Sequence, residues 1–197
     1  MESLKSIEII RKLSSSNLSL FTISDFKKLF AIQQDNTAYK IVERLTKKEI
    51  LKKLTKNRYL FNLLPADDFQ IANFLYYSSY ISLESALCFH GILAQFPYQI
   101  TSITCRKTKS IKAINKEFAY FHIQESLFFG YEKKESFLIA SPEKALIDYL
   151  YFCSKGLRNF EPDDFELKTI NKKNFCDLIK QINNKKLNQF IKKLKLC

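Results

Sequence analysis

Glycine and proline are rare in this chain, with 3 glycines and 4 prolines in 197 residues. A sandwich or barrel of many short strands needs such residues at most of its tight turns, so this composition disfavours both architectures. Apolar residues make up 46% and charged residues 26%, close to globular averages, which disfavours disorder and fibrous repeats. The composition therefore predicts an α+β fold, with helices joined to short strands.

The N-terminal part begins with helical periodicity. Apolar residues recur there at a spacing of three to four, which is typical of amphipathic helices. The pattern predicts helices over residues 4–13, 25–30 and 36–48. We expect Ser24 or Thr22 to cap the second helix and Asn36 to cap the third, because short polar side chains satisfy free backbone N–H groups.

After the third helix the period changes to the alternation of strands. Residues 50–54 and 58–62 alternate around a Lys56-Asn57 turn, which predicts a β-hairpin. Three helices followed by a hairpin are typical of a winged helix-turn-helix, whose third helix enters the DNA major groove. We therefore expect such a DNA-binding domain over residues 1–64.

The remainder of the chain predicts a mixed α/β domain over residues 69–160, and C-terminal helices over 161–197 that pack on it. Ser82 and Ser141 are the expected N-caps of two of its helices, and Gly91 the residue that ends the first of these. Strands are expected over residues 98–105, 117–123 and 136–140, and further helices over 71–77, 174–182 and 184–196.

Positive charge is concentrated in the expected third helix and hairpin. The chain carries 32 basic and 20 acidic residues, a net charge of +12, and residues 40–58 hold eight of the former and two of the latter. This distribution favours nucleic acid as partner, the alternative being a solvated helix face. Thr37, Lys40 and Arg44 should face bases. The hairpin residues Lys52, Lys53, Lys56 and Arg58 should face phosphates. The candidate DNA-binding residues are Thr37, Tyr39, Lys40, Arg44, Lys47, Lys48, Lys52, Lys53, Lys56 and Arg58.

Other classes of site lack a signature. The five cysteines show no CxxC spacing, which favours reduced thiols in a cytoplasmic protein over a disulfide scaffold. The longest uncharged stretch, residues 85–105, contains too many polar groups for a bilayer core, so no membrane partner is expected. We expect no metal and no cofactor, because no phosphate loop or histidine–cysteine cluster occurs.

Catalytic readings are weaker than structural ones. His90 lies where a helix should end, a position that the helix dipole favours for histidine. Lys144 and Asp148 form an i,i+4 pair, and Glu143 suits the start of a helix. The acids of residues 162–168 are too close in sequence to converge on a metal from separate strands. We therefore expect no enzymatic activity.

Ordered sequence blocks resemble one known family. The blocks are Ile23-Ser24-Asp25-Phe26, Tyr39 to Leu45, Arg58-Tyr59-Leu60-Phe61, Tyr80 to Leu87 with His90-Gly91, Ile100 to Thr104 with Arg106-Lys107, Phe128 to Glu132, and Ile139 to Asp148. In this order, over about residues 5 to 155, they resemble the AbiEi-type antitoxins of abortive-infection toxin–antitoxin systems. Hairpins of that family usually carry glycine at the turn. Asn57 stands in this chain's turn, and asparagine also accepts a left-handed conformation.

The resemblance implies a winged-helix repressor of its own operon whose second domain counteracts a nucleotidyltransferase-like toxin. It implies as partners an inverted-repeat operator in double-stranded DNA and the cognate toxin, with direct toxin contact left open. We expect a monomer or weak dimer in solution and a dimer on DNA. The antitoxin-domain signature residues are Tyr80, Ser82, Glu84, His90, Gly91, Arg106, Phe129, Gly130, Tyr131, Pro142, Glu143, Lys144 and Asp148.

Two alternatives remain open on the sequence alone. One is an enzyme whose second domain modifies nucleic acid or the toxin and depends on His90, Glu143 or Lys144. The other is an interaction module whose basic face binds RNA or an acidic partner protein.

Overall fold

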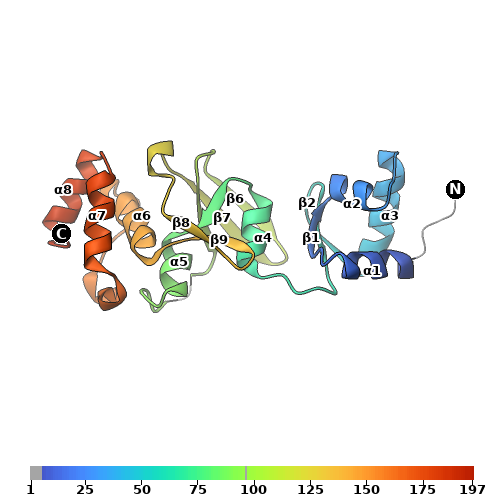
Figure 1. Cartoon of the computed structure of the whole chain (residues 1–197), viewed down its shortest axis with the longest axis horizontal. Coiled ribbons are helices and arrows are strands. Elements are labelled where there is room, and N and C mark those ends of the chain that lie inside the picture. Colours follow the sequence, from blue (N-terminus) through green and yellow to red (C-terminus); the bar gives the residue numbers. More distant parts are fainter. Residues whose placement is uncertain (1–5, 96) are drawn as a thin grey trace. The chain divides into compact units, whose positions relative to one another are not determined.

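The computed structural model describes residues 6–95 and 97–197, which form an α+β structure with eight α-helices and two β-sheets (Figure 1). These residues divide into two compact units. The first contains the chain up to Leu75 together with Lys112–Asn115, and the second contains Tyr76–Ile111 and Lys116–Cys197. Among the described residues, no helix combines the length and apolar content needed to cross a bilayer.

The first unit is built from helices around a small antiparallel sheet of strand order β1-β3-β2. Its elements are α1 (Ser6–Ser15), β1 (Leu20–Thr22), α2 (Ile23–Leu29), α3 (Asp35–Lys47), β2 (Leu51–Thr55), β3 (Arg58–Phe61) and α4 (Asp68–Leu75). The predicted hairpin is confirmed, since β2 and β3 pair antiparallel. The predicted start of the first helix at residue 4 lies outside the described residues.

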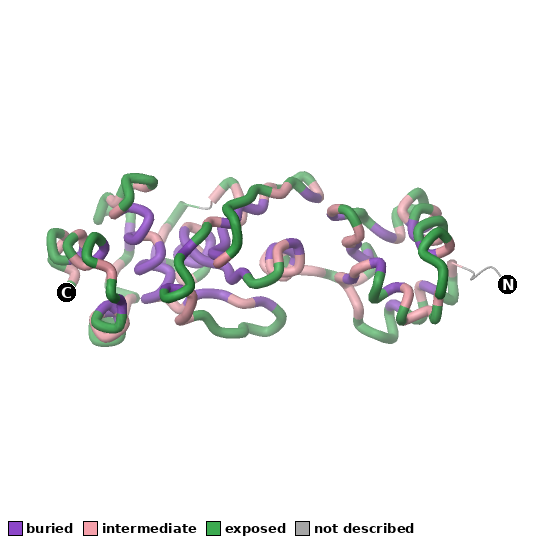
Figure 2. Tube along the Cα trace, turned by 90° about the horizontal axis from the view of Figure 1, so that it is seen from above, coloured by how far each residue is buried: buried purple, intermediate pink, exposed green. Residues whose placement is uncertain are grey.

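One apolar cluster holds α1, α2, α3 and the sheet of this unit together. Leu13 of α1, Phe26 of α2 and Leu45 of α3 are fully buried in it, with Phe21 and Phe61 from the strands. The Phe21 ring stacks on the Phe26 ring at a centroid distance of 5.8 Å. In Figure 2 the purple segments mark where the backbone carries such buried residues.

The helix caps agree with the sequence in one case and differ in another. Thr22 caps α2 in a capping box, accepting from the Asp25 N–H while the Asp25 carboxylate accepts from the Thr22 N–H. The Asn36 cap of α3 is wrong. The N-cap residue is Gln34, which makes no side-chain cap bond, and the helix starts at Asp35, whose carboxylate pairs with Lys27 of α2.

A six-stranded mixed sheet of order β6-β7-β5-β4-β9-β8 belongs to the second unit, except for Lys112 and Ala113 at the end of β6. Its strands are β4 (Ser79–Ile81), β5 (Ile100–Thr104), β6 (Lys109–Ala113), β7 (Lys116–His122), β8 (Tyr131–Lys134) and β9 (Phe137–Ala140). Strand β4 pairs antiparallel with β5 and parallel with β9. The sequence predicts β5, β7 and β9 but not the other three. Strands β6 and β8 lie at the edges of the sheet, and their lysine and glutamate side chains are exposed. Their sequences therefore lack the alternation of apolar residues by which a half-buried strand is predicted.

The helices of this unit are α5 (Leu83–Phe89), α6 (Pro142–Ser154), α7 (Lys172–Gln181) and α8 (Lys185–Lys193). Short 3₁₀ turns occur at η1 (Glu125–Leu127), η2 (Pro162–Asp164) and η3 (Leu167–Thr169). Ser141 caps α6 as expected, accepting from the Lys144 N–H. Helices α7 and α8 both pack against α6.

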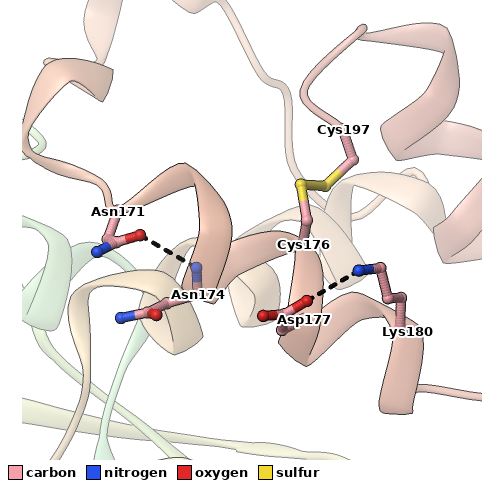
Figure 3. Close-up of a disulfide and its surroundings, with 6 residues drawn as sticks. All are labelled: Asn171, Asn174, Cys176, Asp177, Lys180 and Cys197. Atoms are coloured by element: carbon pink, nitrogen blue, oxygen red, sulfur yellow. Dashed lines mark hydrogen bonds and ion pairs between the residues drawn. A yellow bond between two sulfur atoms is a disulfide. The ribbon is translucent and has the colours of Figure 1, made fainter.

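The expectation that all cysteines are reduced is wrong. Cys176 of α7 and Cys197 form a disulfide, with their Cα atoms 5.7 Å apart (Figure 3). Their sequence separation of 21 residues gives no local signal. The pairing arises because the chain folds back after α7, so that the end of the chain returns to that helix. Cys88, Cys105 and Cys153 are free thiols.

Candidate nucleic-acid interface

The outer side of α3 carries a group of basic side chains. Ala38, Val42 and Leu45 occupy its buried side. Since an α-helix has 3.6 residues per turn, residues between these positions lie on the opposite side. Four cations and one carboxylate line a shallow depression of about 310 Å³ there, and we call these five residues the α3 basic face. They are Lys40, Glu43, Arg44, Lys47 and Lys48.

The single acid of the α3 basic face is neutralised within the face. The Lys47 ammonium lies 2.9 Å from a Glu43 carboxylate oxygen, and both side chains are exposed. The hydrogen bond and charge of Lys47 lower the pKa of Glu43. Lys40 and Lys48 are exposed and Arg44 is half-buried. The face therefore carries a net charge of about +3 when Glu43 is ionised.

The hairpin is tied to α2 and α3 through its turn. Asn57 lies in the turn with a φ of +64°, the left-handed conformation that the sequence leads us to expect. Its backbone carbonyl accepts from the Ile23 N–H at 3.0 Å, at the start of α2. Its side-chain carbonyl accepts from the Tyr39 hydroxyl of α3 at 2.9 Å. Lys52, Lys53 and Lys56 of the hairpin are exposed, so these contacts fix a second group of cations relative to the α3 basic face.

Three of the candidate DNA-binding residues have other contacts. Arg58 is half-buried, its Nε donates to the Phe74 carbonyl at 3.1 Å, and its guanidinium lies 5.8 Å from the Phe74 ring centre. The structure therefore engages Arg58 within the chain, which leaves the lysines as the outward cations of the hairpin. Tyr39 holds the turn, and the Thr37 hydroxyl lies 3.5 Å from Gln34 Oε1.

The second unit brings four signature residues together in its interior. Tyr80 of β4 and Ser82 just after it meet Lys144 and Asp148 of α6, and all four are fully buried. The Tyr80 and Ser82 hydroxyls donate to Asp148 Oδ2 at 3.0 and 2.7 Å. The Lys144 ammonium donates to the Tyr80 hydroxyl at 3.0 Å and pairs with Asp148 Oδ1. We call these four residues the buried polar cluster.

Three further signature residues surround this cluster. Gly130 has a φ of +72°, and a Cβ at that position would lie 3.0 Å from Lys144 Cγ, so the lysine stem passes directly over the glycine backbone. The Lys144 ammonium lies 5.3 Å from the Phe129 ring centre. Tyr131 stacks on Tyr80 with ring centres 4.6 Å apart. The segment Phe129 to Tyr131 thus covers the cluster.

The electrostatics of the cluster follow from its burial. Burial raises the pKa of Asp148, and the Lys144 charge and the hydrogen bonds from Lys144, Ser82 and Tyr80 oppose this rise. Burial and the neighbouring Asp148 raise the pKa of Tyr80 well above its ordinary value, which keeps its hydroxyl protonated as a donor. The expected side-chain cap at Ser82 is wrong, because the hydroxyl serves Asp148 instead.

The other signature residues are dispersed in the unit. Glu84 of α5 pairs with the Arg158 guanidinium, with Oε1 2.5 Å from Nε. His90 Nε2 lies 2.8 Å from the Ala140 carbonyl, which ties the end of α5 to β9. Gly91 has a φ of +69°, as a helix terminator requires.

Three remaining signature residues also make contacts within the fold. Pro142 is the first residue of α6. Glu143 accepts from the Asn171 N–H at 3.1 Å, just before α7. Arg106 lies over the Tyr76 ring at 5.5 Å. In the part of the chain that the structure describes, no group of three or more histidine, cysteine, aspartate or glutamate residues could hold a metal ion.

Sequence reasoning missed one link of the candidate interface. The sequence predicts Tyr39 as a DNA-binding residue, but no local pattern reveals the hydrogen bond from its hydroxyl to Asn57. The lysines of the C-terminal helix, by contrast, are visible in the sequence alone.

No protein-family model matches this sequence, and no curated protein is significantly similar to it. The fold is similar to a crystal structure of the RV2827C protein from Mycobacterium tuberculosis, with a TM-score of 0.55 and 13% sequence identity. The similarity covers 93% of this chain and 70% of that one. It therefore extends to both units of the described chain, and at this identity it concerns the fold alone.

Proposed function

We propose that this chain is a DNA-binding antitoxin of the AbiEi type, in which residues 1–64 form a winged helix-turn-helix that binds the operator of its own operon. The observation that carries the DNA-binding proposal is the α3 basic face beside the exposed hairpin lysines. Both belong to the first unit and are joined by the Tyr39–Asn57 hydrogen bond. A helix flanked by a basic ribbon is suited to a major groove and its adjoining phosphates.

The two groups of cations would have different tasks. Lys40 lies near the middle of α3 and Arg44 in its last turn, and both line the α3 basic face. From such a face, side chains of a helix lying in the major groove reach base edges. The hairpin lysines meet phosphates, which adds affinity and fixes register without reading sequence. Two copies on an inverted repeat, with half-sites about 34 Å apart, would multiply the modest affinity of one unit.

The second unit would serve as the antitoxin domain without enzymatic activity. Lys144 and Asp148, its most reactive-looking pair, are fully buried beneath Phe129 to Tyr131, which supports a structural role. A catalytic group must reach its substrate, and the side chains of this pair are almost completely inaccessible to solvent. The toxin as partner, and repression of its operon, rest on the sequence blocks that resemble the AbiEi family.

The DNA-binding test uses fluorescence anisotropy of the full chain on a duplex covering the region upstream of its own gene, against a shuffled duplex. The Lys40→Gln/Arg44→Gln variant is expected to lose the preference for the upstream duplex. The matched control, Arg11→Gln/Lys12→Gln on α1, removes the same charge and is expected to keep that preference. An upstream preference that survives in the α3 variant would refute the assignment of α3.

The antitoxin test co-expresses the chain with the product of the adjacent gene. We expect the adjacent product to arrest growth when alone, and the α3 variant to rescue growth as well as the wild type does. Failure of the wild-type chain to rescue growth, or an adjacent product that is harmless, would overturn the antitoxin half of the proposal.

A further inference from the structure

A second concentration of positive charge lies at the C-terminal end of the chain. Residues 171–197 contain eight lysines and a single acid, Asp177, for a local charge of +7. Residues 40–58 contribute +6, so these two segments account for all of the net +12 and the remainder sums to −1. We call the eight the C-terminal lysine surface. They are Lys172, Lys173, Lys180, Lys185, Lys186, Lys192, Lys193 and Lys195.

Every lysine of this surface is exposed. The apolar side of α8 is used within the unit, where Leu187 and Ile191 are buried and the helix packs against α6. The lysines consequently project outward, and Figure 2 shows much of the C-terminal segment in green. Lys180 lies 2.8 Å from the Asp177 carboxylate, the only acid among them.

The disulfide joins the two halves of this surface. The bond between Cys176 and Cys197 attaches the end of the chain to the middle of α7 (Figure 3). The Leu196 N–H also donates to the Ile191 carbonyl, which keeps the last residues on α8. The residues after α8, which include Lys195, are thereby attached to α7 instead of forming a free tail.

The charge and composition of the C-terminal lysine surface favour a polyanion with a regular backbone as its ligand. Among the described residues of α7 and α8, none is a large apolar side chain that is fully exposed, so neither insertion into a bilayer nor stacking of unpaired bases has a group to use. The pairs Lys185–Lys186 and Lys192–Lys193 lie seven residues apart, about 10 Å along the helix. That length of a nucleic-acid duplex carries about six phosphate charges.

We propose that the C-terminal lysine surface binds the phosphate backbone of double-stranded DNA without reading its sequence. The surface adds a salt-dependent contribution to affinity that is separate from that of the α3 basic face. The choice of DNA over other duplexes rests on the proposed function, whereas the choice of a phosphate backbone rests on the charge and composition of α7 and α8.

The experiment measures binding of the full chain to a random-sequence 30-base-pair DNA duplex by fluorescence anisotropy at several salt concentrations. The test variant replaces four lysines of α8 by glutamine, at Lys185, Lys186, Lys192 and Lys193. The matched control variant makes the same change at four exposed lysines elsewhere, at Lys107, Lys112, Lys133 and Lys168. Thermal unfolding followed by circular dichroism verifies that both variants fold.

We expect the test variant to reduce the slope of log affinity against log salt by about three and the affinity at low salt by about tenfold or more. The control variant is expected to change both much less. Equal effects of the two variants would show a general charge effect and overturn the proposal. The proposal would also be overturned if the test variant kept its affinity for the DNA duplex and lost affinity only for vesicles containing phosphatidylserine, or only for duplex RNA of the same length.

Measurements on the random-sequence duplex and on the upstream duplex separate this proposal from the proposed function. The Lys40→Gln/Arg44→Gln variant should still lose affinity for random DNA when the α8 lysines are also replaced. If the chain shows no preference for its upstream DNA but the α8 variant lowers random-duplex affinity, the operator proposal fails and this one stands. If the upstream preference holds while the α8 variant matches its control, the reverse is true.

Discussion

Replacing Lys144 by methionine would remove the only cation of the buried polar cluster while keeping most of the side-chain volume. Asp148 would then be fully buried with two hydroxyl donors and no counter-charge. Breaking a buried ion pair in this way generally costs about 3–5 kcal/mol. The cost has an upper limit, because the carboxyl can take up a proton instead.

The limit can be worked out from the ordinary pKa of the carboxyl, which is 3.8. Holding Asp148 neutral in the folded state costs about 4.4 kcal/mol at pH 7 and about 1.6 kcal/mol at pH 5. Because burial raises the pKa of Asp148 in the folded state, this penalty is absent below its ordinary pKa and grows as the pH rises. The Lys144→Met deficit should therefore shrink by about half or more between pH 7 and pH 5.

The assay is urea unfolding followed by circular dichroism at both pH values, with the transition of the second unit followed separately. Asp148→Asn should be similarly costly, because it leaves the Lys144 ammonium buried without its partner. The double variant Lys144→Met/Asp148→Asn should be more stable than the sum of the singles implies, by about 2 kcal/mol or more. A Lys144→Met deficit below about 1 kcal/mol, or one that does not vary with pH, would refute the ion-pair argument.

Two other predictions follow from the second unit. Gly130→Ala should lower the free energy of unfolding by about 2 kcal/mol or more, because alanine disfavours the left-handed conformation and its Cβ would press on Lys144. The control Gly156→Ala has the same φ with no atom nearby, and it should cost only about 1 kcal/mol in urea unfolding. Burial raises the pKa of the Cys153 thiol to about 12, so at pH 8 iodoacetamide should label the less buried Cys88 faster in the native protein, and faster labelling of Cys153 would contradict the packing of α6.

Local features were largely predictable from the sequence. The capping box of α2 needs only Thr22 and a residue three positions later, and the hairpin turn needs only a residue such as Asn57 that tolerates a positive φ. The edge strands β6 and β8 were missed because exposed strands lack the apolar alternation on which such predictions depend. The N-cap of α3 lies two residues before the expected Asn36, at Gln34, and Asp35 pairs with Lys27 of α2, a contact between helices that no local pattern reveals.

The sequence by itself determined the outward cations of α3, since the 3.6-residue period separates Lys40 and Lys47 from the buried Val42. Only the tertiary structure decided that Lys144 and Asp148, which look like a surface helix pair, lie in the interior against Tyr80. The physical reason is that helical periodicity relates neighbours a few residues apart. Partners more than sixty residues away are chosen by sheet order and by the need to satisfy every buried charge.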